Sequence, residues 1–466
     1  MKSLALCIAI LWPLFSMPTE QTKLPRLSVS ENSRFLVQED GTPFFYLADT
    51  AWELFHRCNR EQADRYLKKR ASQGFNVIQA VALAELDGLN TPNPYGHNPL
   101  IEADPNRPNE AYFEHVDYVI RSAERLGLYI ALLPTWGDKL NTKSWGVGPE
   151  VLHPSNAFAY GKWLGKRYKD QQNIIWVIGG DRNPREESQD VEVWNQMALG
   201  VIAGVGDADK ALMSFHPQPT ELGGSSTWFH EEDWLDFNMH QTGHCPNRAT
   251  YDLISHDYAL MPTKPVLDGE PLYEDHPNCF NLKEKGYSTA RDIRRIMYQN
   301  VFAGAMGQTY GCHDVWQMYS LDKEPINHPP RPWTEALDLP MATQVKHLKN
   351  LMLSRPYLSR VPAQEMIVNE GSADFSNQPI ATRDANGSYA MVYLPTGQKL
   401  TLDLSVLRSS RLKAWWYDPR TGTSIDQDVL DISQQRSFVP PSQGLGNDWV
   451  LVLDAVNAGF CAPARL

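Results

Sequence analysis

Short apolar runs alternate with helix-like segments from about residue 25 to residue 335, and this alternation constrains the fold more than any other feature of the chain. Strands that alternate with helices pair in parallel. Eight such units predict closure into a (β/α)₈ barrel, a TIM barrel of the α/β class, rather than an open sheet. The expected strands are residues 44–49, 77–83, 129–134, 174–179, 212–216, 237–241, 266–269 and 307–310.

Segments with capping residues and helical spacing of apolar side chains separate these runs. An open, doubly wound sheet is the alternative arrangement, but the chain has no Gly-rich phosphate loop of the kind that accompanies it. Before the first run, residues 27–36 alternate and meet Glu39-Asp40-Gly41-Thr42, which predicts a hairpin at the bottom of the barrel. The expected helices are residues 59–73, 109–126, 156–169, 189–203, 290–303 and 341–353.

The pattern changes at about residue 356. Short alternating runs separated by turn residues predict a small antiparallel β-sandwich over residues 356–466, after a barrel domain at 25–355. Trp415 and Trp416 are adjacent in one run, so they point to opposite faces of its sheet. One of them must therefore leave the sandwich core and either pack against the barrel or bind sugar. The expected strands are residues 389–394, 400–404, 413–417 and 449–453.

The N-terminus has one lysine followed by about a dozen apolar residues, which predicts a secretory signal peptide over residues 1–19 and an exported protein, periplasmic or secreted. The run is too short to span a membrane, which takes about 20 residues. Of six cysteines, five remain once Cys7 is removed, and their spacing does not suggest zinc. They are either free thiols or form one bridge, for which Cys245 and Cys279 are candidates. A net charge of −12 argues against nucleic acid or an anionic membrane surface as partner.

Two carboxylates stand at strand ends. Gly180-Asp181 follows the apolar run 174–179, and Gly269-Glu270 ends the run that begins at residue 266. Catalytic groups of a barrel lie at the C-terminal ends of its strands, and a carboxylate pair at one mouth is what cleavage of a glycosidic bond requires. Each acid has a structural alternative, because Asp181 can cap a turn and Glu270 can pair with an arginine. Glu85 and Asp87 are rival catalytic acids.

Other polar and aromatic side chains follow the same strands, where indole and phenol rings stack on sugars and polar groups bond hydroxyls. Asp49 can instead be a structural cap, and the tryptophans can be core residues. His240 is expected to bond the sugar or Glu270. The candidate substrate-binding residues are Asp49, Trp52, Glu85, Asn93, Tyr95, Trp136, Arg182, Asn183, His216, His240, Tyr310, His313 and Trp316.

Metal and cofactor chemistry has little support in the sequence. His216, His240 and His244 lack the HExxH or HxH spacing of a metal site. The chain has no GxSxG elbow for a serine hydrolase. We therefore expect neither a metal ion nor an organic cofactor, and a polysaccharide or oligosaccharide as partner.

At these residues the chain resembles a known family, the bacterial apiosidase-like glycosidases of glycoside hydrolase family 140. The resemblance spans roughly residues 27–350, and the region after it resembles the β-sandwich that usually follows this barrel, sometimes labelled a collagen-binding domain. The motifs that carry it are DGTPFFYLADTAW (40–52), GFNVIQ (74–79), PNPYG (92–96), NIIWVIGGDRN (173–183), GAMGQTYG (304–311) and, in the sandwich, WYDPRTG (416–422).

The resemblance implies an exported enzyme of plant-pectin degradation that hydrolyses the linkage between apiose and galacturonic acid in rhamnogalacturonan II with retention. It assigns the acid/base to Asp181 and the nucleophile to Glu270. Related barrel glycosidases usually carry Asn-Glu where this chain has Gly180-Asp181. The acid is thus one methylene shorter, which a shift of backbone or substrate must offset. The alternatives are a glycosidase of arabinosidase- or galactosidase-like specificity, and a non-catalytic carbohydrate-binding protein.

Overall fold

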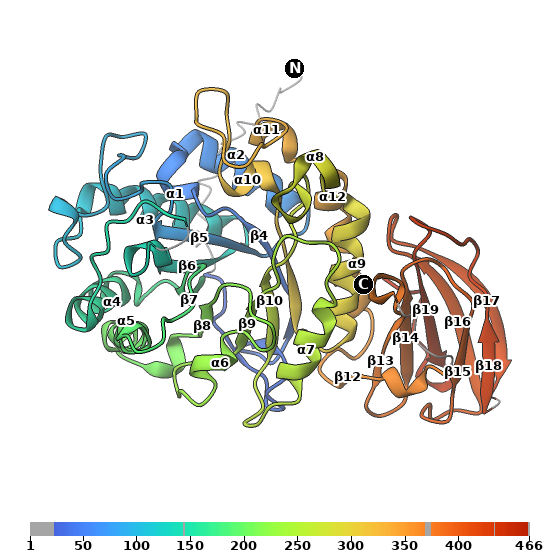
Figure 1. Cartoon of the computed structure of the whole chain (residues 1–466). Helices are drawn as coiled ribbons and strands as arrows, with labels where there is room; N and C mark the ends of the chain where they lie inside the picture. Colours follow the sequence, from blue (N-terminus) through green and yellow to red (C-terminus); the bar gives the residue numbers. More distant parts are fainter. Residues whose placement is uncertain (1–22, 143–144, 369–373, 433, 465–466) are drawn as a thin grey trace, which may run out of the picture.

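The computed structural model describes residues 23–142, 145–368, 374–432 and 434–464. The predicted signal peptide, residues 1–19, lies outside them. An α/β domain is followed by a smaller β domain at its side (Figure 1). Within the described residues, no helix combines the length and the apolar character needed to cross a membrane.

Eight strands run through the centre of the α/β domain, and they correspond to the eight predicted runs with shifts of at most two residues at their ends. Their side chains are buried throughout, as expected for parallel strands covered by helices. The strands are β4 (Tyr46–Thr50), β5 (Val77–Leu83), β6 (Tyr129–Thr135), β7 (Ile174–Gly179), β8 (Met213–His216), β9 (Asn238–Gln241), β10 (Val266–Glu270) and β11 (Gly307–Tyr310).

These strands form two parallel sheets. Six strands pair in the order β11-β4-β5-β6-β7-β8, and β9 pairs with β10 in a sheet of two. β9 lies beside β8, and β10 beside β11, without ladder hydrogen bonds between named strands in the described structure. Parallel pairing is confirmed, whereas a fully closed (β/α)₈ barrel stays a prediction.

Helices cover the outside of these sheets, and several begin at capping groups that the sequence indicates. The Asn59 side chain accepts a hydrogen bond from Gln62 N and the Gln62 side chain accepts one from Asn59 N, which is a capping box. The α-helices are α1 (Leu54–Arg57), α2 (Arg60–Ser72), α3 (Glu110–Arg125), α4 (Pro154–Tyr168), α5 (Asp190–Val205), α6 (Ser226–Phe229), α7 (Thr250–Tyr258), α8 (Leu282–Lys285), α9 (Ala290–Phe302), α10 (His313–Trp316), α11 (Trp333–Ala336) and α12 (Pro340–Leu353). The 3₁₀ turns are η1 (Ile101–Ala103), η2 (Gly137–Lys139), η3 (Ala208–Lys210), η4 (Asn278–Phe280), η5 (Gln364–Met366), η6 (Phe375–Asn377) and η7 (Val456–Ala458).

The N-terminal hairpin forms as predicted. β1 (Leu27–Val29), β2 (Leu36–Gln38) and β3 (Pro43–Phe44) make a small antiparallel sheet. Gln38 N donates to Thr42 O at 2.9 Å across the turn. The Phe44 ring packs edge-on against Tyr129, the first residue of β6, with ring centroids 5.2 Å apart. The hairpin thus lies at the N-terminal end of the strands, opposite the end where the candidate catalytic groups stand.

The β domain consists of two antiparallel sheets, one in the order β12-β13-β14-β19-β16-β17 and one that pairs β15 with β18. Four of its strands match the predicted runs, and β12, β13, β17 and β18 were not predicted. The strands are β12 (Arg360–Pro362), β13 (Ile380–Asp384), β14 (Tyr389–Leu394), β15 (Leu400–Asp403), β16 (Arg411–Asp418), β17 (Thr423–Asp431), β18 (Gln435–Phe438) and β19 (Trp449–Ala455).

The larger sheet packs one of its faces against the α/β domain. Trp416 is buried in the core of the β domain, whereas Trp415 points to the other face and packs against the hydrophobic cluster that spans both domains. On that face Tyr393 stacks on Tyr298 of α9 with centroids 5.0 Å apart. The prediction that the two tryptophans separate, with one turned toward the α/β domain, is confirmed.

Two buried ion pairs stand at this side of the larger sheet. Arg294 of α9 donates to both carboxylate oxygens of Asp448 at 2.7 and 2.6 Å. Arg355, which follows α12, does the same to Asp454 at 2.8 and 2.7 Å. Loss of one partner of a buried pair leaves an uncompensated charge and costs about 3–5 kcal/mol. Both pairs therefore make the α/β domain dependent on the β domain.

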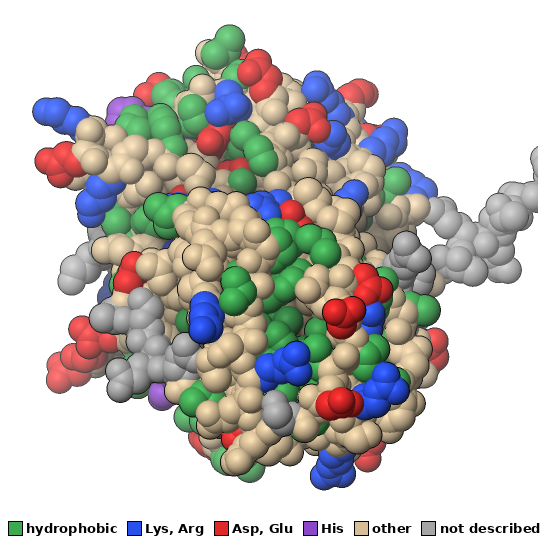
Figure 2. Space-filling model, turned by 90° about the vertical axis from the view of Figure 1, so that its right-hand side faces the viewer, with side chains coloured by type: hydrophobic (Ala, Val, Ile, Leu, Met, Phe, Trp, Pro, Cys, Tyr) green, Lys and Arg blue, Asp and Glu red, His purple; other side chains and the backbone are tan. Residues whose placement is uncertain are grey.

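The outer face of the β domain carries charged side chains of both signs. Figure 2, which views the molecule from that side, shows Lys and Arg interspersed with Asp and Glu among exposed apolar groups. Ile425 and Val429 of the edge strand β17 are 42% and 39% exposed. Among the described residues seen from this side, no extended basic area stands out that would attract a polyanion.

We predict that deletion of the chain after residue 355 gives an insoluble or unstable α/β domain. The deletion exposes Tyr298 and removes Asp448, the counter-charge of Arg294. Soluble yield and thermal unfolding of the truncated and full-length proteins measure this. A soluble truncated protein that still hydrolyses short substrates but no longer binds polysaccharide would show instead that the β domain is a carbohydrate-binding module.

Candidate active site

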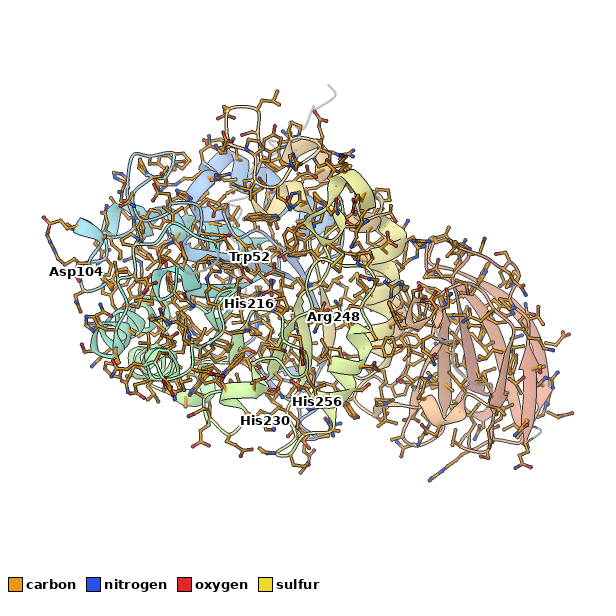
Figure 3. The ribbon with its side chains drawn as sticks, viewed as in Figure 1. Trp52, Asp104, His216, His230, Arg248 and His256 are labelled. Atoms are coloured by element: carbon orange, nitrogen blue, oxygen red, sulfur yellow. A yellow bond between two sulfur atoms is a disulfide. The ribbon has the colours of Figure 1, made fainter. Side chains whose placement is uncertain are left out.

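A cavity of about 610 Å³ is lined by both predicted catalytic carboxylates. Asp181 follows β7 and Glu270 ends β10, so both stand at the C-terminal ends of strands. Figure 3 shows Trp52 and His216 near the centre of the α/β domain, whereas the labelled Asp104, His230 and His256 lie toward its periphery. Five of the predicted substrate-binding residues also line this cavity: Trp52, Glu85, Trp136, His313 and Trp316.

The backbone turns sharply where β7 delivers its acid. Gly179, Gly180 and Asp181 have φ values of +85°, +144° and +53°, three consecutive residues in a region that favours glycine. A Cβ at Gly180 would lie 2.9 Å from a ring carbon of Trp136. Position 180 therefore requires glycine, because the Trp136 indole leaves no room for a side chain. Asp181 has a backbone conformation that residues other than glycine rarely adopt. Such strain gathers at functional sites.

The Asp181 carboxyl is held on one side. Its Oδ2 accepts hydrogen bonds from Trp145 Nε1 at 2.8 Å and from Arg182 Nη1 at 3.2 Å. Its Oδ1 is buried and makes no hydrogen bond of good geometry with the described residues. The side chain of Gln241 faces the same carboxyl.

A bulge directs Glu270 into the cavity. The pairing of β10 with β9 shifts between Asp268 and Glu270, and bulges re-aim side chains in this way. Glu270 Oε2 lies 3.0 Å from His216 Nε2, and its Oε1 lies 3.2 Å from His244 Nε2. The carboxylate is thus flanked by one imidazole at each oxygen.

His216 connects the two acids. Its Nδ1 accepts a hydrogen bond from the backbone N–H of Asp181 at 3.2 Å. The proton of the neutral ring must then reside on Nε2, which faces Glu270. The ring is fully buried and contacts the indoles of Trp52 and Trp136, with centroids 5.4 and 5.7 Å away. The His216 imidazole therefore contacts both the turn that carries Asp181 and the carboxylate of Glu270.

The two carboxyls are driven to opposite charge states. Burial, with the negative charge of Glu270, raises the pKa of Asp181 to about 7, although Arg182 opposes the rise. Burial also disfavours the charged form of Glu270, but hydrogen bonds from His216 and His244 outweigh it and hold the pKa of Glu270 well below its usual value. Carboxyl pairs whose pKa values are pushed apart in this way serve as an acid and a nucleophile.

A third carboxyl, Glu85, lines the same cavity. Burial and the negative charges of Asp181, Glu53 and Asp138 raise the pKa of Glu85 well above its usual value. Burial and these charges therefore favour the protonated form of Glu85, which can donate as well as accept a hydrogen bond. It lacks the flanking imidazoles that keep Glu270 ionised.

Aromatic rings and neutral imidazoles form the rest of the wall. Trp52 Nε1 donates to the Tyr273 hydroxyl at 3.1 Å. His244 stacks on His276 with centroids 4.3 Å apart, and His276 meets His313 edge-on at 4.5 Å. Burial lowers the pKa of His313 to about 4 and that of His276 well below its usual value, so both rings are neutral. Flat apolar faces with a few polar atoms suit a sugar ring.

The structure places eight other predicted substrate-binding residues outside the cavity lining, which corrects their expected positions. Asp49 is buried with Arg70, whose Nε donates to it at 2.6 Å, and with the hydroxyl of Tyr66. Tyr310 donates to Glu274 at 2.7 Å. His240 faces Asp257 at 3.1 Å rather than a sugar or Glu270. These groups are already paired within the protein.

The remaining five of the eight shape or support the site from behind. Asn93 accepts from the backbone of its own loop, and the Tyr95 hydroxyl accepts from Arg60 N at 2.9 Å. Asn183 accepts from Gln218 N at 2.8 Å. Arg182 and His216 contact the two catalytic candidates directly, but from beneath the cavity surface.

Several lining residues were not among the predicted site residues. Gln241 is the last residue of β9, and most of the others belong to loops that have no periodic pattern. Tyr273 follows Glu270 by three residues, which was one available signal, and His244 was considered in the sequence only as a metal ligand. A disulfide between Cys245 and Cys279 joins the loops that carry His244 and Phe280, with Cα atoms 4.5 Å apart. The lining residues missed are Leu86, Trp145, Gly146, Val147, Pro219, Gln241, His244, Tyr273, His276, Phe280, Ile326 and Asn327.

Comparison with known proteins agrees with this geometry. Residues 30–359 match the family described as "Apiosidase-like, catalytic domain". The chain belongs to the apiosidase-like family. Residues 361–454 match a family described as "Putative collagen-binding domain of a collagenase".

Two solved structures are similar over nearly the whole apiosidase-like chain. One, named glycoside hydrolase, is 33% identical with a TM-score of 0.84 and covers 93% of this chain and 97% of its own. The other, a glycoside hydrolase family 5 protein from Bacteroides vulgatus ATCC 8482, is also 33% identical with a TM-score of 0.84, covering 93% and 94%. No curated protein sequence matches this chain. The protein is thus a glycoside hydrolase with a carbohydrate substrate.

We predict that kcat/KM falls as the pH rises through about 7, because deprotonation of Asp181 removes the acid in the free enzyme. Asp181→Asn should abolish this alkaline limb and lower turnover about 10²–10⁴-fold. Glu270→Gln should abolish turnover. Rates measured from pH 4 to pH 9 for each variant test this.

Glu85→Gln is the matched control for these two variants. Glutamine reproduces the neutral form of Glu85, so the alkaline limb should stay near pH 7 with turnover within about tenfold of wild type. An unchanged profile in Asp181→Asn, together with loss of the limb in Glu85→Gln, would transfer the acid role to Glu85.

Proposed function

We propose that this protein is a retaining glycosidase that cleaves the linkage between apiose and galacturonic acid in rhamnogalacturonan II. In this proposal its α/β domain is a closed (β/α)₈ barrel of the glycoside hydrolase family 140 type. The single observation that carries the catalytic assignment is the pair Asp181 and Glu270 in one cavity with pKa values shifted in opposite directions. The match to the apiosidase-like family supports the substrate.

In the first step Glu270 attacks the anomeric carbon and forms a glycosyl ester while the glycosidic C–O bond breaks. Asp181 gives its proton to the departing oxygen, so the leaving sugar departs as an alcohol. In the second step the Asp181 carboxylate takes a proton from water, whose oxygen attacks the anomeric carbon and releases Glu270. The flanking His216 and His244 stabilise the charge of the free Glu270 carboxylate, which is present before the first step and is restored by the second.

The lining of the cavity supports a neutral sugar at the cleaved position. Its described lining residues include carboxyls, imidazoles and indoles but neither lysine nor arginine. A uronic acid carboxylate placed against Asp181, Glu85 and Glu270 would face three acidic groups without a cation. This favours apiose in the cavity and galacturonic acid on the leaving-group side.

Product analysis tests the substrate and the stereochemistry. Digestion of rhamnogalacturonan II should release apiose, and NMR of the first product formed should show the retained anomer. Retention places the two carboxyl groups about 5–5.5 Å apart, whereas inversion needs roughly 6.5–9.5 Å. An inverted product would remove the nucleophile role of Glu270. Release of arabinose or galactose from a panel of aryl glycosides, but no apiose, would establish the alternative specificities.

We also propose that the protein is exported after removal of residues 1–19. The disulfide between Cys245 and Cys279 supports this, because such bonds persist in oxidising compartments. Mass analysis of the protein recovered outside the cytoplasm should show a mature N-terminus after residue 19 or nearby. A full-length chain that stays in the cytoplasm would overturn the proposal.

A further inference from the structure

The two oxygens of the Asp181 carboxyl have different surroundings. Oδ2 accepts from Trp145 Nε1 at 2.8 Å and from Arg182 Nη1 at 3.2 Å. Oδ1 is buried and makes no hydrogen bond of this geometry with the described residues, although the side chain of Gln241 also faces the carboxyl. A carboxylic acid proton cannot reside on an oxygen that two N–H groups already occupy without losing one of those bonds. The proton of neutral Asp181 therefore belongs on Oδ1.

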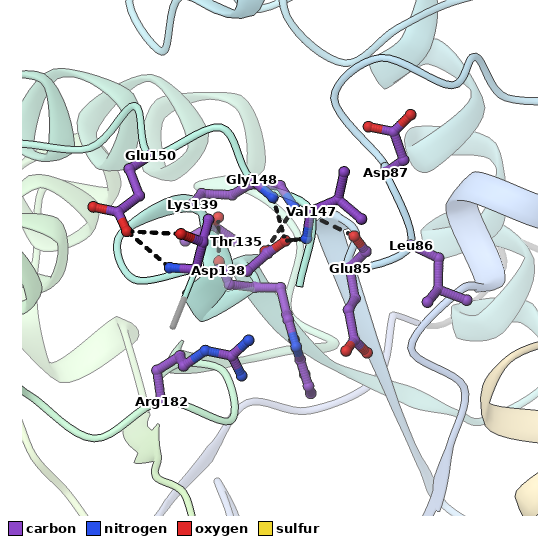
Figure 4. A network of polar contacts seen from close by, with 12 residues as sticks. Glu85, Leu86, Asp87, Thr135, Asp138, Lys139, Val147, Gly148, Glu150 and Arg182 are labelled. Atoms are coloured by element: carbon purple, nitrogen blue, oxygen red, sulfur yellow. Dashed lines mark hydrogen bonds and ion pairs between the residues drawn. The ribbon is translucent and has the colours of Figure 1, made fainter. Parts of the chain in front are cut away.

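The backbone of Trp145 is held in place by groups around it. Arg182 donates to the Trp145 carbonyl, and its guanidinium carbon lies 4.7 Å from the centre of the indole. Next to it, Asp138 Oδ2 accepts from Val147 N at 3.2 Å and from Gly148 N at 3.1 Å. Figure 4 shows the part of this network in which Asp138 accepts from Val147 and Gly148.

Gly146 allows this close approach. Its φ is +112°, and a Cβ there would lie 2.6 Å from Asp138 Cβ and 2.8 Å from Arg182 Nη2. The loop can lie on Asp138 and Arg182 only with glycine at this position. The indole N–H thus reaches the acid from a supported loop, even though the Trp145 side chain is 47% exposed in relative terms.

We propose that Trp145 is a positioning residue for the catalytic acid: its indole N–H occupies Oδ2 of Asp181, which directs the transferable proton to Oδ1 and toward the leaving group. This inference rests on the proposed acid role of Asp181. The aspartate is one methylene shorter than the glutamate usual at this strand, so it has less freedom to find its own orientation. Trp145 supplies that orientation from a separate loop.

Removal of the indole N–H has two consequences. The proton can then reside on either oxygen, so fewer molecules present it to the leaving group. The ionised form of Asp181 also loses a hydrogen bond, which raises its pKa further. The other titratable groups that face Asp181 stay unchanged in such a variant; they are Glu85, Arg182, His216 and Glu270.

Trp145→Phe keeps the aromatic ring and removes the donor. We expect kcat/KM to fall about 10–100-fold on substrates with poor leaving groups, the range for loss of one hydrogen bond to a charged group. On activated aryl glycosides, which need no protonation, the fall should stay within about threefold. The alkaline limb of the pH profile should move to higher pH. Trp163→Phe, at a ring that packs on Phe113 away from the cavity, is the matched control and should change neither readout.

Two further variants, Gly146→Ala and Asp181→Asn, distinguish failure of the proposed acid role from failure of the inference about Trp145. Gly146→Ala displaces the loop and should reproduce the dependence on leaving group seen in Trp145→Phe, with unfolding temperature measured in both. If Asp181→Asn keeps full activity, the proposed acid role itself fails. If Asp181→Asn is impaired while Trp145→Phe loses activity equally on both kinds of substrate, with an unmoved alkaline limb, Trp145 is only a wall of the cavity and the present inference is wrong.

Discussion

The contact on which the site depends is the one between the His216 ring and the backbone N–H of Asp181. Because Nδ1 is the acceptor at 3.2 Å, the neutral ring has its proton on Nε2, 3.0 Å from Glu270. The turn after β7 and the carboxylate at the end of β10 are thereby joined through one buried side chain at the end of β8. A shift of any of these three strands would separate the acid from its partner.

That arrangement also explains how one cavity holds carboxyls in different charge states. Burial disfavours the charge on every one of them, so the difference arises from their neighbours. Two imidazoles face Glu270 and lower its pKa. For Asp181, burial and the charge of Glu270 raise the pKa and one guanidinium lowers it. For Glu85, burial and three negative charges raise the pKa. The neutral acids and the ionised nucleophile are thus consequences of the same folded geometry rather than of residue type.

The sequence predicted the parts of this molecule that repeat. The strand runs are short, apolar and buried, so their C-terminal ends, and with them Asp181 and Glu270, could be located. An apolar run does not say which polar side chain pairs with which, and so the pairing of Asp49 with Arg70 and of His240 with Asp257 was missed. Loop residues such as Trp145 have no such pattern. In the β domain, β17 escaped prediction because most of its side chains are exposed.

The orientation of Asp181 depends on loop residues as well as on the strand that precedes it. A shorter acid at the end of β7 requires a backbone that turns further, and the three positive φ values from Gly179 to Asp181 provide that turn. The turn fits only because Gly180 leaves room for Trp136, whose own strand leads into the loop that carries Trp145. Trp145 and Asp181 lie 36 positions apart in the chain and are joined by a hydrogen bond in the site. The short carboxyl at the end of β7 therefore receives its indole donor from the loop that follows β6.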